Sequence, residues 1–280
     1  MNYYELQINL HSFDAWHDIF VAYLAEIDFE SFVEEAPYLK AYIQESSYDG
    51  HQLQSVLNEL QLKGALIESY DLRLLPQQNW NATWEAQFEP VLINEQLRIV
   101  APFHSLSPFE GIEIKILPKM SFGTGHHQTT HLICQNMLSL DLQNKRVLDM
   151  GAGTGVLAIL AEQLGAAQID AVEIEEWSAE NILENIELNQ CQKISAIHGG
   201  AEAIPQSDYD IILANINKNV LLEQLPNYSK VIKSGGLLML SGFFQTDAQD
   251  LRSAAAQLGF EWLRTDLREN WAVVLLKKIP

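Results

Sequence analysis

The most constraining feature of this 280-residue chain is the stretch from Val147 to Gly155, which reads VLDMGAGTG. An apolar run that ends in an acid, Asp149, is followed by a loop with glycine at every second position and by a helical pattern over 156–164. Glycine lets the backbone turn tightly and pass close to a ligand without Cβ clashes. The free N–H groups and positive dipole end of the helix face the same ligand. In an α/β sheet, such a strand–loop–helix unit predicts a site for a nucleotide-like cofactor.

The spacing of Gly151, Gly153 and Gly155 distinguishes between cofactors. The dinucleotide fingerprint G-x-G-x-x-G places its third glycine three residues after the second, where this chain has Val156. The order D-x-G-x-G-x-G instead resembles motif I of class I S-adenosylmethionine-dependent methyltransferases. That cofactor has no pyrophosphate, so the loop has to pass its amino acid moiety rather than cradle phosphates. The alternative is a plain glycine-rich turn without a cofactor. The neighbouring segments have to distinguish between these two interpretations.

Two further predicted strands end in polar residues. The apolar segment 168–174 carries Glu173 near its tip, about 20 residues beyond Gly153, where an acid is placed to accept hydrogen bonds from two ribose hydroxyls. The alternative for Glu173 is a solvated carboxylate at a strand end. The apolar segment 209–215 ends in Asn215, whose side-chain oxygen can accept an N–H from an incoming amine or from the amino group of the cofactor. The alternative for Asn215 is an N-cap of the following helix.

Charge and composition limit the classes of partner. The chain has 17 basic and 37 acidic residues, a net charge of −20. Because a broad nucleic-acid interface needs a basic face, this charge argues against direct nucleic-acid binding. It suits a basic partner, with acids that only aid solubility as the alternative. We expect a monomer.

Targeting and redox signals point to the cytoplasm. No uncharged apolar run reaches the roughly 18 residues of a membrane span, so we expect no membrane contact. The N-terminus lacks the basic and apolar regions of a signal peptide. The two cysteines, Cys134 and Cys191, form neither a metal spacing nor a disulfide framework, as in a reduced cytoplasmic protein.

Residues 1–76 read as a separate small α+β domain. Apolar patterns predict the order β-α-β-β-α-β, which is that of the ferredoxin-like split unit. The predicted strands are 3–10, 29–34, 38–44 and 65–75, and the predicted helices are 12–24 and 52–62.

Residues 77–118 are predicted to be a linker and connecting segment. Trp80, Trp84 and Phe88 recur at the spacing of one helical face, which is more typical of packing than of a ligand cage. The stretches 91–101 and 111–117 alternate as strands and suggest a hairpin across the segment.

Residues 119–280 form the predicted catalytic domain, which begins with the glycine-rich polar stretch MSFGTGHHQTTH over 120–131. Its serine and threonine residues are suited to capping the helix that follows. His126 and His127 could suggest a metal site, but adjacent side chains diverge and no nearby carboxylate or cysteine completes a ligand set, so we predict no metal. The same two residues are candidates for a general base on position alone.

Seven strands are expected in this domain, in a doubly wound sheet with one antiparallel strand near its edge. The expected strands are the apolar run before the motif loop and then 168–174, 193–198, 209–215, 237–241, 260–267 and 271–277.

Three segments together resemble a known family. The stretch from Phe122 to Thr130, the loop from Asp149 to Gly155 and the tripeptide Ala214-Asn215-Ile216 occur in the same order in bacterial methyltransferases of the ribosomal large-subunit protein L-eleven (L11). The resemblance also covers the small N-terminal domain and the Trp-rich linker at 79–84. The stretch over 122–130 is much more specific than motif I alone.

The resemblance implies a ferredoxin-like domain that recognises the substrate protein, and a class I domain that methylates lysine side chains and the N-terminal amine. Carried over by position, the cofactor contacts are Thr130, Gly151, Glu173 and Asn215, with Gly153 and Gly155 in the same loop. Two positions depart from the family: Ala152 stands where many members have Cys, and Asn217-Lys218-Asn219 follows the tripeptide where other members differ.

The implied reaction is in-line displacement of the sulfonium methyl by a neutral amine. We predict Asn215 as the catalytic residue, because its amide can orient that amine. A methyltransferase acting on another protein or a small molecule, and a non-catalytic module on the same fold, remain the alternatives.

Overall fold

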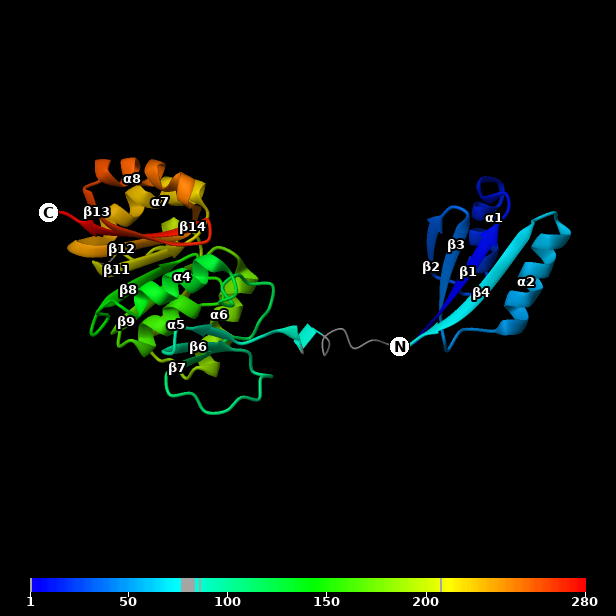
Figure 1. Cartoon of the computed structure of the whole chain (residues 1–280), viewed down its shortest axis with the longest axis horizontal. Coiled ribbons are helices and arrows are strands. Elements are labelled where there is room, and N and C mark those ends of the chain that lie inside the picture. The colour runs from blue at the N-terminus through cyan, green and yellow to red at the C-terminus, as the bar shows by residue number, and fades with distance from the viewer. Residues whose placement is uncertain (1, 77–83, 86, 207) are drawn as a thin grey trace. The chain divides into compact units, whose positions relative to one another are not determined.

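The computed structural model describes residues 2–76, 84–85, 87–206 and 208–280. Its contacts divide the chain into two compact units, Met1–Gln87 and Phe88–Pro280 (Figure 1). Each unit is described by itself. Among the described residues, no helix has the length and apolar character needed to cross a bilayer.

The first unit is a four-stranded sheet with two helices. The elements are β1 (Tyr3–Leu10), α1 (Phe13–Ala25), β2 (Ser31–Glu35), β3 (Tyr38–Gln44), α2 (Gly50–Leu62) and β4 (Ile67–Leu75). The strand order is β2-β3-β1-β4, and all neighbours are antiparallel. Alternate residues of β1, Leu6, Ile8 and Leu10, are buried in one core with Phe20 and Leu57 of the two helices. This architecture is the predicted ferredoxin-like one.

The second unit is built on a seven-stranded sheet of order β10-β9-β8-β11-β12-β14-β13. Its strands are β8 (Arg146–Met150), β9 (Gln168–Glu173), β10 (Ile194–His198), β11 (Tyr209–Asn215), β12 (Ile232–Phe244), β13 (Phe260–Arg268) and β14 (Trp271–Lys278). The first five pair in parallel, whereas β14 is antiparallel to both of its neighbours. The structure therefore confirms the predicted doubly wound class I methyltransferase sheet.

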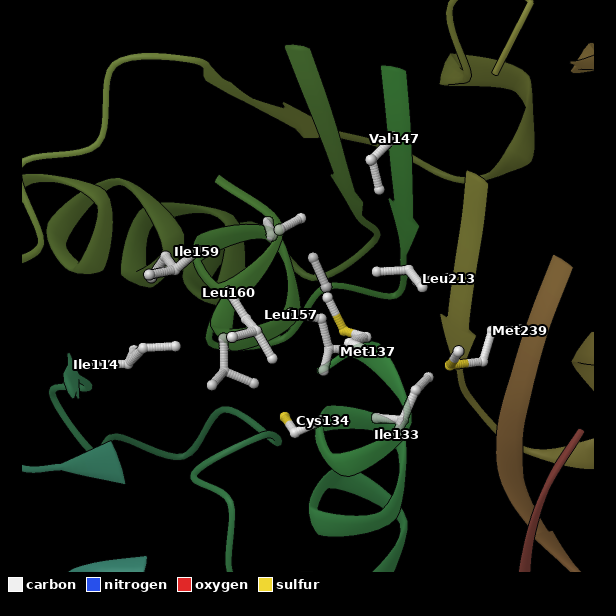
Figure 2. Close-up of a cluster of buried hydrophobic side chains, with 14 of the residues drawn as sticks. Ile114, Ile133, Cys134, Met137, Val147, Leu157, Ile159, Leu160, Leu213 and Met239 are labelled. Atoms are coloured by element: carbon white, nitrogen blue, oxygen red, sulfur yellow. The ribbon is translucent and has the colours of Figure 1, made fainter. Parts of the chain in front are cut away.

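Helices cover both faces of this sheet (Figure 1). They are α4 (Gln128–Met137), α5 (Val156–Gln163), α6 (Glu176–Leu188), α7 (Lys218–Val231) and α8 (Ala248–Gln257). Val147 of β8 lies in the cluster formed with α4 and α5, shown in Figure 2, while its neighbour Leu148 lies in the cluster with α7 and α8. Successive residues of a strand point to opposite faces of the sheet, and here both faces are buried. This explains why these strands read as continuous apolar runs.

The chain order changes direction at β8. The next strand along the chain, β9, pairs with one side of β8, and β11 pairs with the other side. Ligands of open α/β sheets bind at the carboxyl ends of strands at such a switch point. The glycine loop follows β8 directly at this point.

The segment before α4 corrects one prediction. The stretch 91–101 is itself a hairpin of β5 (Val91–Ile93) and β6 (Leu97–Val100), and β7 (Ile112–Lys115) pairs with β6 in parallel. The hairpin predicted across the whole segment is therefore wrong. The turn forms at Asn94, whose φ of 55° is a conformation that asparagine tolerates well.

The predicted aromatic stripe is only partly described. Trp80 lies outside the described residues, and Trp84 lies in a helical stretch. Phe88 lies beyond that stretch, with its ring 4.6 Å from the ring of His126. The prediction of packing is therefore confirmed for Phe88 alone: Trp84 is 46% exposed, and the predicted helical face does not extend to Phe88.

Candidate active site

The glycine loop requires glycine on steric grounds. Gly151, Gly153 and Gly155 all have positive φ, at 70°, 57° and 78°. A Cβ atom at Gly151 would lie 2.3 Å from Cγ2 of Ile216, and one at Gly153 would lie 2.3 Å from the carbonyl oxygen of Phe122. The loop is therefore held between the tip of β11 and the 120–125 stretch, with no room for a larger residue.

Asp149, the acid before the loop, supports the helix rather than the pocket. It is fully buried, and its Oδ2 accepts a hydrogen bond of 3.0 Å from the N–H of Ala158 in the first turn of α5. The N-cap of α5 is Gly155, which offers no side chain, so Asp149 supplies the capping oxygen from the strand. Burial, together with the charge of Glu173, raises the pKa of Asp149 to about 7.

Glu173 is held in a fixed orientation at the tip of β9. Its Oε2 accepts from the N–H of Gly153 at 2.8 Å, and its Oε1 accepts from the N–H of Glu175 at 3.1 Å. The residue is buried but borders a pocket. Because a carboxylate has about four lone-pair sites, both oxygens can accept further donors such as hydroxyls.

A pocket of about 590 Å³ lies at the carboxyl ends of β8, β9 and β11. The predicted residues Gly151, Gly153, Glu173 and Asn215 all border it. Its walls are mostly apolar and include Met120, Phe122, His127, Met150, Ile174, Trp177, Ala201, Ile216, Val220 and Trp271. An apolar pocket with a few convergent polar groups is the usual form of a cofactor site.

The other two predicted cofactor residues, Thr130 and Gly155, lie behind the lining. Thr130 is fully buried in α4, and its hydroxyl accepts from Nδ2 of Asn215 at 3.3 Å. Gly155 begins α5. Their direct contact with a cofactor stays a prediction.

Asn215 combines a fixed amide with a free acceptor. Thr130 holds its Nδ2, whereas its Oδ1 is buried and has no hydrogen-bond partner among the described residues. The capping alternative is wrong for Asn215, because the N-cap of α7 is Asn217, whose Oδ1 accepts from the N–H of Val220 at 3.2 Å. A buried amide oxygen without a partner is costly, which indicates that a ligand donor completes it.

His127 caps α4 and faces the pocket. Its Nδ1 accepts from the N–H of Thr129 at 3.3 Å, so the neutral ring carries its proton on Nε2. Burial lowers the pKa of His127, which favours this neutral form. A ring that is neutral but uses its free nitrogen as a cap is a poor general base. His126 donates instead to the carbonyl oxygen of Glu89 at 2.9 Å.

Sequence reasoning did not find a group of contacting aromatic rings, three of which border the same pocket as Asn215. The ring of His127 lies 5.1 Å from that of Phe122 and 4.7 Å from that of Trp271, and Phe244 lies 4.1 Å from Trp271. Phe122, His127 and Trp271 border the pocket and are called the aromatic wall, whereas Phe244 is not part of the pocket lining. Trp271 begins the last strand, and no local signal links it to a loop that precedes it by more than a hundred residues.

Comparison with known proteins agrees with this geometry. A family model described as ribosomal protein L11 methyltransferase matches residues 16–279. A ribosomal protein L11 methyltransferase of Porphyromonas gingivalis is 40% identical over 260 residues, which cover 92% of this chain and 89% of that protein. One of Phocaeicola vulgatus is 38% identical, with 98% of each chain covered.

The fold has the same relatives. The crystal structure of a ribosomal protein L11 methylase from Lactobacillus delbrueckii subsp. bulgaricus matches with a TM-score of 0.65 and 25% identity, over 69% of this chain and 100% of that chain. The family match spans most of both units and includes every residue of the pocket. The chain therefore belongs to the ribosomal protein L11 methyltransferase family.

Proposed function

We propose that this chain transfers methyl groups from S-adenosylmethionine to the lysine side-chain and N-terminal amines of ribosomal protein L11. The observation that carries the proposal is the buried Oδ1 of Asn215, which has no hydrogen-bond partner among the described residues and belongs to a residue that borders the same pocket as the aromatic wall. The family match supports L11 as the protein substrate.

The pocket fits S-adenosylmethionine in three respects. The carboxylate of Glu173 keeps acceptor capacity for two ribose hydroxyls, Gly151 and Gly153 border the pocket where their backbone can contact the amino acid moiety, and the apolar walls suit an adenine ring. When bound, this cofactor supplies an already activated methyl group on its sulfonium. The protein then has to align a nucleophile and exclude water.

The acceptor amine has to enter as a neutral base. An unperturbed lysine has a pKa of about 10.4, and desolvation against aromatic rings lowers it. Phe122 and Trp271 of the aromatic wall supply such an environment, and the neutral ring of His127 adds no charge to it. Oδ1 of Asn215 can accept one N–H of the amine and so aim its lone pair. The side-chain amide of Asn215 cannot accept the proton that the amine has to lose, so this proton is transferred to water.

Residues 1–76 are proposed as the part of the enzyme that recognises L11. In the same proposal the enzyme is a monomer and acts in the cytoplasm. The net charge of −20 favours encounter with a basic protein. In the same proposal the enzyme does not bind nucleic acid directly.

The test is methylation of purified L11 with labelled S-adenosylmethionine, read by mass spectrometry of its peptides. The matched control is L11 whose amines have been acetylated. We expect label on lysine and N-terminal peptides of the untreated protein and none on the acetylated one. Equal labelling of both would contradict amine transfer, and no labelling of L11 together with labelling of another protein or small molecule would replace the substrate.

A further inference from the structure

Helix α6 and its C-cap residue carry a row of polar side chains, of which only Ser178 borders the pocket. Ser178, Asn181, Asn185 and Asn189 follow one another at spacings of three or four residues and so share one side of the helix. Asn181 and Asn185 are fully buried. Buried amides at successive turns of a helix need partners, and these partners show what the row does.

The first partner is the backbone of residues 115–121, which leads from β7 to the pocket. Oδ1 of Asn189 accepts from the N–H of Lys115 at 2.8 Å, and Nδ2 of Asn189 donates to the carbonyl of the same residue at 2.6 Å. Oδ1 of Asn185 accepts from the N–H of Leu117 at 2.8 Å. The side-chain amides take the place that a neighbouring strand would take.

Nearer the pocket the same helix holds the segment with other groups. Ser178 donates to the hydroxyl of Ser121 at 3.1 Å, and Lys119 pairs with Glu184 at 2.7 Å. The segment is therefore fixed along most of the length of α6, up to the residue before Phe122.

Asn185 has a second partner in the glycine loop. Its Nδ2 donates to the carbonyl oxygen of Thr154 at 2.9 Å. Thr154 in turn donates its N–H to the carbonyl of Phe122 at 2.9 Å and its hydroxyl to the carbonyl of Gly123 at 2.7 Å. One amide thus joins the segment before the pocket to the loop behind it, and that loop holds the end of the same segment.

We infer that Asn185 is a positioning residue for the cofactor: it fixes the glycine loop against the 115–123 segment, so that Gly153 and Phe122 keep their places in the pocket wall. Asn185 does not itself border the pocket. Its role needs both ends of the amide, an acceptor for Leu117 and a donor for Thr154. The inference rests on the proposed function only through the identity of the pocket as the S-adenosylmethionine site.

The substitution Asn185→Asp separates the two ends. An ionised aspartate still accepts from Leu117 but presents an oxygen to the carbonyl of Thr154, so the bond to the loop is lost and replaced by repulsion. We expect the dissociation constant of S-adenosylmethionine to rise by about tenfold or more. Asn185 does not border the pocket, so the substitution removes no group that faces the reacting atoms. At saturating cofactor we therefore expect kcat on L11 to change by less than about threefold.

Asn189→Asp is the matched control, since it makes the same change in the same row but does not contact the glycine loop. Calorimetric titration of the full-length proteins with S-adenosylmethionine, alongside thermal unfolding, is the measurement. We expect the control to bind within about twofold of the natural protein. An Asn185→Asp protein that binds as tightly as the control would overturn the inference, whereas a natural protein that does not bind the cofactor would overturn the proposed function first.

If Asn185→Asp does not fold, Asn185→Ala decides the matter. This substitution removes the bonds of Asn185 to Leu117 and to Thr154 and places no charge in the buried site. We expect a dissociation constant raised by about threefold or more. Unchanged affinity in a folded Asn185→Ala protein would overturn the inference.

Discussion

The buried Asp149 makes the stability of the second unit depend on pH in a direction that can be computed. Burial raises its pKa from 3.8 to about 7. The folded state therefore holds this proton over a pH range in which the unfolded state has released it. Stability from this group is fully present below a pH of about 4 and is lost as the pH rises to about 7, above which both states are ionised.

The size of this effect follows from the two pKa values. A separation of about 3 pKa units at 1.36 kcal/mol each gives about 4 kcal/mol in full, of which about 3 kcal/mol falls between pH 5 and pH 8. The matched variant is Asp149→Asn, which keeps an oxygen to cap α5 at Ala158 and cannot ionise.

Denaturant unfolding of both proteins from pH 5 to pH 8 measures the difference. We expect the variant to gain about 3 kcal/mol on the natural protein across this range, because only the natural protein has to bury a charge at the upper end. A difference in unfolding free energy that stays constant with pH would refute the reasoning and place the pKa of Asp149 near its ordinary value.

The remaining predictions concern the pocket. Asn215→Ala should bind S-adenosylmethionine within a few-fold of the natural protein but lose about 100-fold in kcat on L11, and full turnover would remove the orienting role. Glu173→Gln should weaken cofactor binding about tenfold in calorimetry, since an amide N–H₂ would face the N–H of Gly153 or of Glu175. Gly153→Ala should show no measurable cofactor binding, because its Cβ would lie 2.3 Å from a carbonyl oxygen. His127→Asn keeps a capping oxygen for α4 and should retain most activity; a loss of about 100-fold with the fold intact would show that His127 is the base after all.

Local patterns were sufficient to predict the frame of the site. The apolar strands with their polar tips and the alternate glycines are features of a few consecutive residues, and they correctly predicted the sheet and which tips share one edge. The resemblance that extends over 122–130 supplied the family, which the comparisons confirm.

The parts that the sequence left open or missed depend on local backbone geometry or on contacts between distant segments. The choice between Asn215 and Asn217 as the cap of α7 turns on two residues of the same type, and only the backbone geometry decides it. Trp271 reaches the pocket through the pairing of β14 with β12, which no spacing reveals. The turn at Asn94 divides one alternating run into two strands without interrupting its pattern.

The place of β14 in the sheet has a consequence for how the enzyme is made. This strand is synthesised after β13, yet it lies between β12 and β13 and is the only link of β13 to the sheet that the described residues provide. A chain emerging from the ribosome can therefore assemble the glycine loop and the tips of β9 and β11 early, whereas β13 has no strand to pair with until β14 has been synthesised. Trp271 joins the pocket lining through the pairing of β14 with β12, so a nascent chain contains the glycine loop and both polar strand tips before it contains the complete lining.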